Sequence, residues 1–327
     1  MSDLRISVVV PTYRRPDLLE RCLAALVEQD FPRDGYEVIV CDDGPDAATR
    51  QMVERWSERA AGAPLVRYVP VRDTQGPAGA RNRGWEIGRG EVIAFTDDDT
   101  IPRPGWLRAG WTAMRPGVAA ATGRVIVPLP LTEPPTDYQR DIARMEQAEF
   151  VTANAFVRRE ELARVGGFDE RFTAAWREDS DLHFKLLETG GTLVKAPEAI
   201  VEHPVRDSAW GSGIGNHRKI AFDALLYKKH PKLYRERIRR TPPWNYYGIV
   251  LALLVLVVGI VLRNTALWLG AFAAWAVLTG LFFTRRLEGA SIAPDHVAEM
   301  VWTSIAIPVV AVFWRLVGAF RYRVPFL

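Results

Sequence analysis

The sequence has little cysteine and lacks the common nucleotide-binding motifs. Its 327 residues include two cysteines, Cys22 and Cys41, and neither belongs to a C-x-x-C or Cys/His pattern. This argues against a disulfide-stapled domain and against a zinc site. The glycine-rich stretch at 76–84 matches neither the Walker pattern nor G-x-G-x-x-G, which argues against an ATPase and a dehydrogenase.

The chain also lacks a strong charge bias and a recognisable leader. The formal net charge of +3 is small and by itself says little about partners. We expect no nucleic acid among them. The N-terminus runs straight into the apolar residues 6–10. This run is too short for a signal sequence and has no cleavage site. We therefore expect the polar part of the chain to stay in the cytoplasm.

Strands and helices alternate over the first hundred residues. Apolar and β-branched runs predict buried strands at 6–10, 37–41, 65–69 and 92–95, and apolar spacing predicts helices at 15–29, 47–61 and 76–87. This alternation is typical of a Rossmann-like α/β fold, in which a mostly parallel sheet has helices on both faces. Ligands bind such sheets at the carboxyl ends of the strands.

Polar clusters follow three of these strands, and we expect them to meet at one crevice. They are Pro11-Thr12-Tyr13-Arg14, Asp42-Asp43 and Asp97-Asp98-Asp99. Adjacent carboxylates repel one another, and a cation relieves that cost. Hard oxygen ligands suit Mg²⁺ or Mn²⁺, which also bind phosphate oxygens. The alternative for the last cluster is a turn that caps a helix beginning near Pro104. Its place after a buried strand favours the metal.

Asp42-Asp43 and the glycine-rich stretch at 76–84 could also contact a ligand at this crevice. Asp42 and Asp43 could accept hydrogen bonds from a base or ribose, or they could form an Asp-Gly turn with Gly44; both can hold together. In the glycine-rich stretch, Arg81 and Arg83 could meet phosphate.

The remainder of the polar part is less regular. The pattern predicts strands at 119–127, 193–196 and 200–202, helices at 160–165 and 178–189, and a proline-rich loop or linker at 128–135.

Candidate catalytic residues open the second of these helices, in Trp176-Arg177-Glu178-Asp179-Ser180-Asp181. Asp179 is a candidate general base for an acceptor hydroxyl. The bland alternative is a carboxylate stabilised by the helix dipole, although one cap does not need so many acidic and hydroxyl residues. His203 follows a predicted strand and is either structural or a further metal or phosphate contact. His217 and Arg218 could neutralise a leaving diphosphate, or face solvent or lipid headgroups.

The C-terminal part predicts a membrane segment. Uncharged apolar runs at 246–262 and 265–284 approach the length of about 20 residues that spans a bilayer, and 297–314 is a third candidate weakened by Glu299 and Pro308. Basic residues between 228 and 240 put that side in the cytoplasm. Three spans would place Arg321 and Arg323 outside, against this rule, whereas an interfacial third helix would keep them inside. Both topologies stay open.

The motifs as a set resemble the family 2 glycosyltransferases, which have the GT-A fold. The matching pieces lie in order over about residues 5–205: Val-Val-Val-Pro-Thr-Tyr at 8–13, Asp42-Asp43-Gly44, Gly79-Ala80-Arg81-Asn82, Thr96-Asp97-Asp98-Asp99, Gly166-Gly167-Phe168-Asp169 and Glu178-Asp179-Ser180-Asp181-Leu182. The resemblance implies a nucleotide-sugar site at Pro11, Thr12, Tyr13, Arg14, Asp42, Asp43, Arg81, Asp97 and Asp98. It further implies Mg²⁺ or Mn²⁺ at Asp99, Asp97 and His203, Asp179 as the base, and an acceptor or diphosphate side at Trp176, Glu178, His217 and Arg218.

The resemblance implies an inverting, metal-dependent transfer of one sugar from a nucleoside-diphosphate sugar. The membrane segment resembles that of members acting on lipid-linked acceptors, so we expect a lipid-linked or membrane-proximal acceptor in cell-envelope glycan or glycolipid synthesis. No Q-x-x-R-W motif follows residue 180, which argues against a processive polysaccharide synthase.

Other functions stay open as alternatives. They are a polyprenyl-phosphate glycosyl synthase, a non-catalytic nucleotide-sugar-binding scaffold and, less favoured, a nucleotidyltransferase. The expected organisation is a catalytic domain at 1–227, a basic juxtamembrane linker at 228–243 and a membrane segment at 244–327 with two or three hydrophobic helices, in the inner or plasma membrane.

Overall fold

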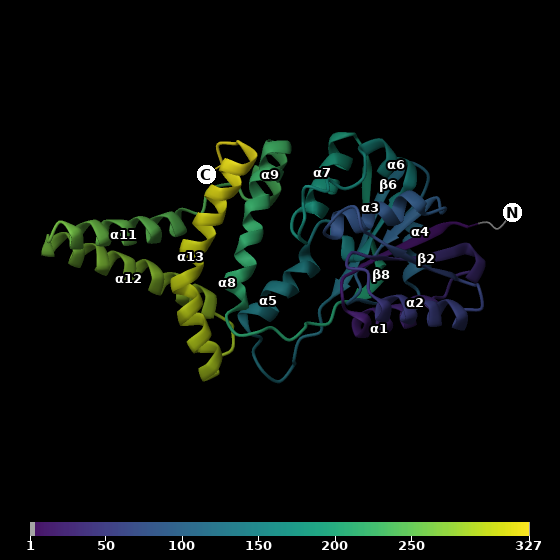
Figure 1. Cartoon of the computed structure of the whole chain (residues 1–327), viewed down its shortest axis with the longest axis horizontal. Helices are drawn as coiled ribbons and strands as arrows, with labels where there is room; N and C mark the ends of the chain where they lie inside the picture. The colour runs from purple at the N-terminus through teal and green to yellow at the C-terminus, as the bar shows by residue number, and fades with distance from the viewer. Residues whose placement is uncertain (1–3, 327) are drawn as a thin grey trace. The chain divides into compact units, whose positions relative to one another are not determined.

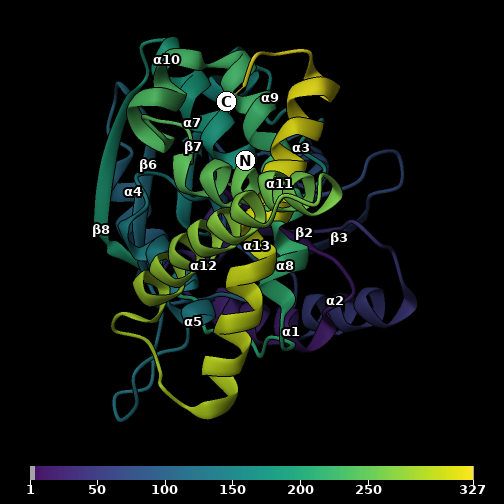
Figure 2. The same cartoon turned by 90° about the vertical axis from the view of Figure 1, so that its left-hand side faces the viewer.

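The computed structural model describes residues 4–326 and divides into two units (Figures 1 and 2). The first unit comprises the described residues up to Pro128 together with Ala143–Val205. The second comprises Leu129–Ile142 and the described residues from Arg206 onward. The second unit therefore takes in a short segment that interrupts the first one along the chain.

The first unit contains one eight-stranded sheet in the order β3-β2-β1-β4-β7-β6-β8-β5. Four strands with parallel neighbours form one half: β1 (Ile6–Thr12), β2 (Tyr36–Asp42), β3 (Leu65–Pro70) and β4 (Val92–Phe95). These are the four strands that the apolar runs predict. They alternate with helices because each parallel connection needs a crossover.

The other half of the sheet is mixed. It contains β5 (Ile101–Pro102), β6 (Val118–Ile126), β7 (Ala155–Arg158) and β8 (Thr192–Glu202). Strand β7 runs antiparallel to both of its neighbours, so the α/β fold is confirmed with a less uniformly parallel sheet than the sequence suggests. The two strands predicted at 193–196 and 200–202 are one strand, β8. Its pairing with β6 slips between Gly123 and Arg124, which explains the break in the sequence pattern.

Helices cover both faces of this sheet. They are α1 (Pro16–Val27), α2 (Ala47–Arg59), α3 (Pro77–Ile87), α4 (Trp106–Ala113), α6 (Arg159–Val165) and α7 (Glu178–Glu188). Alternate residues of β1 point to opposite faces, because the side-chain period of a strand is two. Val8 therefore joins a core with α1, α2 and α4, and Val9 joins another with α3, α6 and α7. The two free cysteines are buried, one in each core.

The second unit is helical. Its helices are α5 (Asp137–Ala143, whose last residue belongs to the first unit), α8 (Ser212–Asn216), α9 (Ala221–Lys229), α10 (Pro231–Leu233), α11 (Trp244–Val261), α12 (Thr265–Leu287) and α13 (Pro294–Tyr322). A 3-10 turn at His217–Ile220 links α8 to α9. The last three helices are long and apolar enough to cross a membrane. The three predicted apolar segments are thus confirmed as helices, and α13 extends beyond the predicted 297–314 at both ends.

Candidate functional site

The ends of β1 and β4 meet as the sequence predicts. The two strands are parallel neighbours, with Val9 opposite Phe95, so the segment after β4 passes beside the end of β1. Thr12 there donates from its hydroxyl to Asp98 Oδ2 over 2.8 Å. Arg15, at the start of α1, donates to the other oxygen of Asp98 over 3.2 Å.

The three adjacent aspartates differ in their surroundings. Asp98 is buried, and both of its oxygens are held by Thr12 and Arg15. Burial raises the pKa of Asp98 to about 6, although Arg15 acts in the opposite direction. Asp97 accepts from Arg81 over 2.7 Å, and Asp99 lies 3.8 Å from Arg15. Asp98 therefore joins two strand ends, while Asp97 and Asp99 flank it.

Asp97, Asp99 and His203 form a candidate metal centre. Each offers one ligand atom, and these atoms lie within 4.8 Å of one another. His203 comes directly after β8, where its backbone N–H donates to Ile126. Its Nε2 lies 3.4 Å from Asp99 Oδ1, and its buried Nδ1 has no hydrogen-bond partner among the described residues. Two carboxylates and an imidazole nitrogen fit Mn²⁺ well and are compatible with Mg²⁺.

Arg81 links this centre to the start of α7. Its side chain is only 3% exposed, and it donates to Asp97 and, over 3.0 Å, to Glu178. The glycine-rich turn before it gives Arg81 this place: at Gly76 φ is +96°, and a Cβ there would lie 2.5 Å from the carbonyl oxygen of Thr173. Arg81 thus sits between two carboxylates, where it can fix the distance between the metal centre and α7.

Glu178 and Asp179 form the acidic start of α7. Arg177, just before them, has a φ of +75° and lies over the Trp176 ring at 4.5 Å. Burial raises the pKa of Glu178 to about 7, Asp179 adds to this, and Arg81 opposes it. Burial also raises the pKa of Asp179, although the backbone N–H of Ser180 donates to its carboxylate over 2.6 Å. A carboxylate with a raised pKa is a better proton acceptor than an ordinary aspartate.

Asp42 and Asp43 end β2 with different partners. Asp42 accepts from the backbone N–H groups of Gly44 and Asp46 and from the Tyr68 hydroxyl, so it holds the turn. Asp43 Oδ2 accepts from the Gly76 N–H over 2.8 Å, whereas its buried Oδ1 has no partner among the described residues. Asp43 therefore keeps an acceptor for a ligand group.

An aromatic ring lies beside these aspartates. The Tyr13 ring, in a side chain that is 46% exposed, packs on Gly44, where a Cβ would lie 2.6 Å from it. Arg14 stacks on the same ring at 5.3 Å from a backbone with φ of +52°. Pro11 precedes them within β1, opposite Cys41. A planar base would find here both a ring to lie against and a carboxylate oxygen.

Two predicted site residues lie in the second unit. His217 and Arg218 belong to the turn at His217–Ile220, and His217 Nδ1 is hydrogen-bonded to the Gly213 carbonyl oxygen. Burial lowers the pKa of His217. Their role on the diphosphate side stays a prediction.

Sequence reasoning missed Arg15. This residue is an ion-pair partner of Asp98 and Asp99, but it reads as the ordinary start of a helix. The available signal is its place after Pro-Thr-Tyr-Arg, two residues beyond an exposed aromatic at a strand end.

Comparison with known families gives two matches. A model described as glycosyl transferase family 2 matches residues 7–165, and one described as glycosyl transferase family group 2 matches residues 92–314. The second match extends from β4 into α13.

Curated relatives are similar over part of this chain. The glycosyltransferase AglE of Haloferax volcanii is 27% identical over 212 residues, which is 62% of this chain and 67% of that protein. The GalNAc(5)-diNAcBac-PP-undecaprenol beta-1,3-glucosyltransferase of Campylobacter jejuni is 30% identical over 124 residues, 38% of each chain. The match spans about half of the validoxylamine A glucosyltransferase of Streptomyces hygroscopicus, at 28% identity and 59% of this chain.

Among solved structures, the mannosyltransferase PcManGT from Pyrobaculum calidifontis, in complex with GDP-Man and Mn²⁺, has a similar fold. It matches with a TM-score of 0.59 and 20% identity over 97% of this chain and 87% of its own. At this identity the likeness shows the fold, which is of the GT-A type with C-terminal apolar helices.

Proposed function

Because the chain belongs to family 2 of the glycosyltransferases, we propose that it moves one sugar, with inversion at the anomeric carbon, from a nucleoside-diphosphate sugar to a lipid-linked or membrane-proximal acceptor. The observation that carries this proposal is the cluster of Asp97, Asp99 and His203, whose ligand atoms lie within 4.8 Å, joined through Arg81 to the acidic start of α7.

In this proposal the donor occupies the strand ends. Asp97, Asp99 and His203 would hold Mg²⁺ or Mn²⁺, which supplies positive charge opposite the diphosphate when bound. Asp43 accepts a hydrogen bond from the base or ribose, and the base lies against Tyr13. Pro11, Thr12, Arg14, Asp42, Arg81 and Asp98 shape this pocket, the last three through their contacts with other protein groups.

Asp179 acts on the acceptor. It takes the proton from the acceptor hydroxyl as that oxygen forms a bond to the anomeric carbon. The bond from this carbon to the diphosphate oxygen breaks, and the nucleoside diphosphate leaves with the electron pair. Trp176 and Glu178 line the acceptor side, and Arg81 holds Glu178 and therefore the helix start that carries the base.

Membrane attachment supports the acceptor class. Three helices are long and apolar enough to cross a bilayer, and the name of the Campylobacter relative specifies an undecaprenol-linked acceptor for that protein. By the positive-inside rule, the basic stretch at 228–243 supports a catalytic domain, 1–227, on the cytoplasmic face of the inner or plasma membrane, with 244–327 as the membrane segment. The product would enter a cell-envelope glycan or glycolipid.

Two substitutions separate metal binding from base catalysis. We expect Asp99→Ala to abolish both transfer and metal-dependent donor binding, because it removes a ligand. Asp179→Asn should abolish transfer and largely retain donor binding, measured by calorimetry with Mn²⁺ and the donor. Glu58→Gln, at an exposed position of α2, is the control and should retain both transfer and donor binding.

Two outcomes would count against these roles. Full turnover by Asp179→Asn with a hydroxyl acceptor rejects the base. Transfer to a lipid phosphate, which needs no proton removed, that is independent of Asp179 would instead favour the polyprenyl-phosphate glycosyl synthase. Undiminished metal-dependent binding by Asp99→Ala rejects the metal centre.

A further inference from the structure

Helix α13 has two unlike faces. Its buried face carries the polar residues His296, Thr303, Ser304 and Arg315. Its exposed face carries an apolar stripe at helical spacing: Trp302, Val309, Phe313, Leu316 and Phe320. The most apolar window of α13 is 44% buried inside the protein, against 17% for α11 and 11% for α12. α13 is therefore covered on one side, unlike the other two.

The stretch from Gly211 to Lys228, which contains α8 and α9, covers one side of α13 and runs parallel to it. Near the beginning, the Gly211 N–H donates to Glu299 over 2.7 Å. Further along, a Cβ on Gly318 would collide with the Ala221 carbonyl oxygen. At the end, Lys228 Nζ donates to the Tyr322 carbonyl over 2.8 Å. These partners belong to the stretch from α8 to α9, which also contains Arg218, Lys219 and Lys229.

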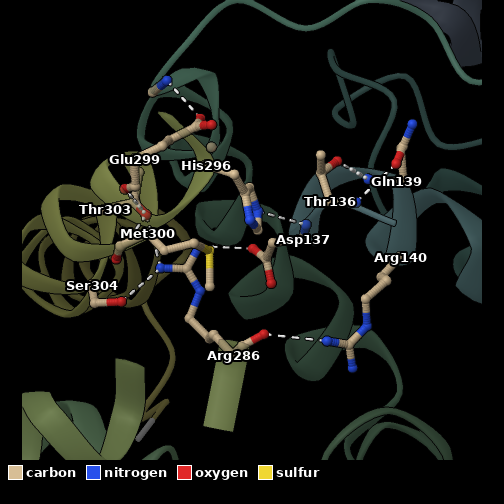
Figure 3. Close-up of polar contacts among 12 residues, drawn as sticks. Thr136, Asp137, Gln139, Arg140, Arg286, His296, Glu299, Met300, Thr303 and Ser304 are labelled. Carbon is tan, nitrogen blue, oxygen red and sulfur yellow. Dashed lines mark hydrogen bonds and ion pairs between the residues drawn. The ribbon is translucent and has the colours of Figure 1, made fainter. Parts of the chain in front are cut away.

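The first half of α13 also holds a charged cluster (Figure 3). Arg286, at the end of α12, donates to Thr303 and Ser304 over 2.9 and 3.0 Å and pairs with Asp137 of α5 at 2.7 Å. His296 Nε2 accepts from the Asp137 backbone N–H.

The same cluster fixes the rest of α5. Arg140 donates to the carbonyl oxygens of Arg286 and Glu288, which binds α5 to the end of α12. α13 thus contacts Asp137 of α5 near its start and packs against α9 over its second half.

A membrane-spanning α13 would take these neighbours into hydrocarbon. Charged side chains and non-helical backbone are costly there unless they are shielded from lipid. Figure 1 shows instead that α13 runs across the α11–α12 hairpin, with the hairpin on one side and α8 and α9 on the other. If the hairpin stands upright in a bilayer, α13 lies along the surface of that bilayer.

We propose that α11 and α12 alone cross the membrane and that α13 lies in the membrane interface, with its apolar stripe in the acyl boundary of an anionic bilayer. α13 packs against both helices of the hairpin. Exposed cations lie at its end: Arg321, Arg323 and Lys228, whose Nζ donates to the Tyr322 carbonyl. Such an amphipathic helix with a basic polar margin binds anionic lipid surfaces. In this arrangement Arg321 and Arg323 lie on the same side of the membrane as the basic linker, as the positive-inside rule requires.

Labelling of single cysteines in the full chain tests the topology. Native Cys22 and Cys41 are fully buried, so a membrane-impermeant maleimide should report only added cysteines. We compare Arg263→Cys, between α11 and α12, with Arg323→Cys, after α13, in sealed vesicles of one orientation. We expect label on opposite sides. Label on the same side would overturn the proposal, because three spans place both positions together.

Glu288→Cys, between α12 and α13, is the matched control. Both topologies place it opposite Arg263, so it shows that the vesicles are sealed and oriented, and we expect Arg323→Cys to follow it.

Depth measurements supply a second readout that does not depend on vesicle orientation. Nitroxides at Trp302→Cys, Phe313→Cys and Phe320→Cys should lie at a similar, shallow depth in vesicles containing anionic lipid. A depth that peaks at position 313 and falls toward both ends would show a spanning helix, and exposure to water at all three would show that the stripe does not meet lipid. Either result overturns the proposal.

Discussion

At the scale of single residues, the same amino acid serves different purposes at adjacent positions. Each carboxylate oxygen of Asp98 accepts a hydrogen bond, one from Thr12 and one from Arg15. Asp97 and Asp99 instead belong to the candidate metal centre. Asp42 holds a turn, and one oxygen of Asp43 has no partner within the described part of the chain. The sequence predicts where these aspartates gather, because strand ends are readable. It does not predict which of them are held by protein groups and which stay available to a metal or ligand, because partners such as Thr12, Gly76 and Arg81 come from distant segments.

Asp43 should matter for donor affinity. We expect Asp43→Asn to raise the KM for the donor by about 10- to 100-fold with little change in kcat, since a hydrogen bond to a charged acceptor contributes roughly 1.5–3 kcal/mol. Steady-state kinetics over donor concentration measure this. Glu54→Gln, an exposed carboxylate of α2, should leave KM unchanged, and an unchanged KM in Asp43→Asn itself would remove Asp43 from the nucleotide site.

The pH dependence should reflect the raised pKa of Asp179. A base must be ionised, so kcat/KM falls as pH drops through this pKa. Because burial raises it, the acidic limb should lie above pH 4, near which an ordinary aspartate titrates. The pH–rate profile of Glu178→Gln should keep this limb. Loss of the limb in that variant would assign it to Glu178, and a limb near pH 4 would contradict the burial argument.

At the scale of elements, the sequence predicts the alternating strands and helices of the first hundred residues, but it misses short elements that follow them. The strand at 92–95 is predicted to the residue, because a short β-branched run is bounded by polar residues. Strand β7 escapes prediction because it lies directly between a 3-10 turn at Thr152–Asn154 and α6, without the polar boundaries that mark β4. α8 and α9 escape because the basic residues between them and at the end of α9 suggest a surface patch, while the packing of both helices against α13 is a long-range property.

The placement of α5 should depend on one ion pair. We expect Arg286→Gln to speed amide exchange in 137–142 by roughly two- to tenfold, the effect of losing about one hydrogen bond, since it frees Asp137 from its partner. Hydrogen–deuterium exchange with mass spectrometry measures this. Arg285→Gln, at the adjacent exposed position, is the matched control and should not change exchange. Equal exchange in both variants would show that the Arg140 contacts alone hold α5.

At the scale of the whole molecule, the order of segments in the sequence differs from their grouping in space. Leu129–Ile142 leaves the first unit after β6 and belongs to the second. Sequence analysis identifies the prolines at 128–135 as a loop or linker but cannot assign the segment after them, because the Asp137–Arg286 pair is separated by 149 residues. The membrane helices are readable from composition, whereas the covered face of α13 is not.

Nucleoside diphosphate release tests the proposed function most directly. The full chain, in nanodiscs with lipid extract as the source of acceptor, is offered UDP-, GDP- and dTDP-sugars with Mn²⁺ or Mg²⁺. We predict release from one class of donor, its loss on adding EDTA, its recovery with Mn²⁺ or Mg²⁺, and no release by Asp99→Ala. Release that persists in EDTA or in Asp99→Ala, or no release from any donor, would contradict metal-dependent transfer at this site.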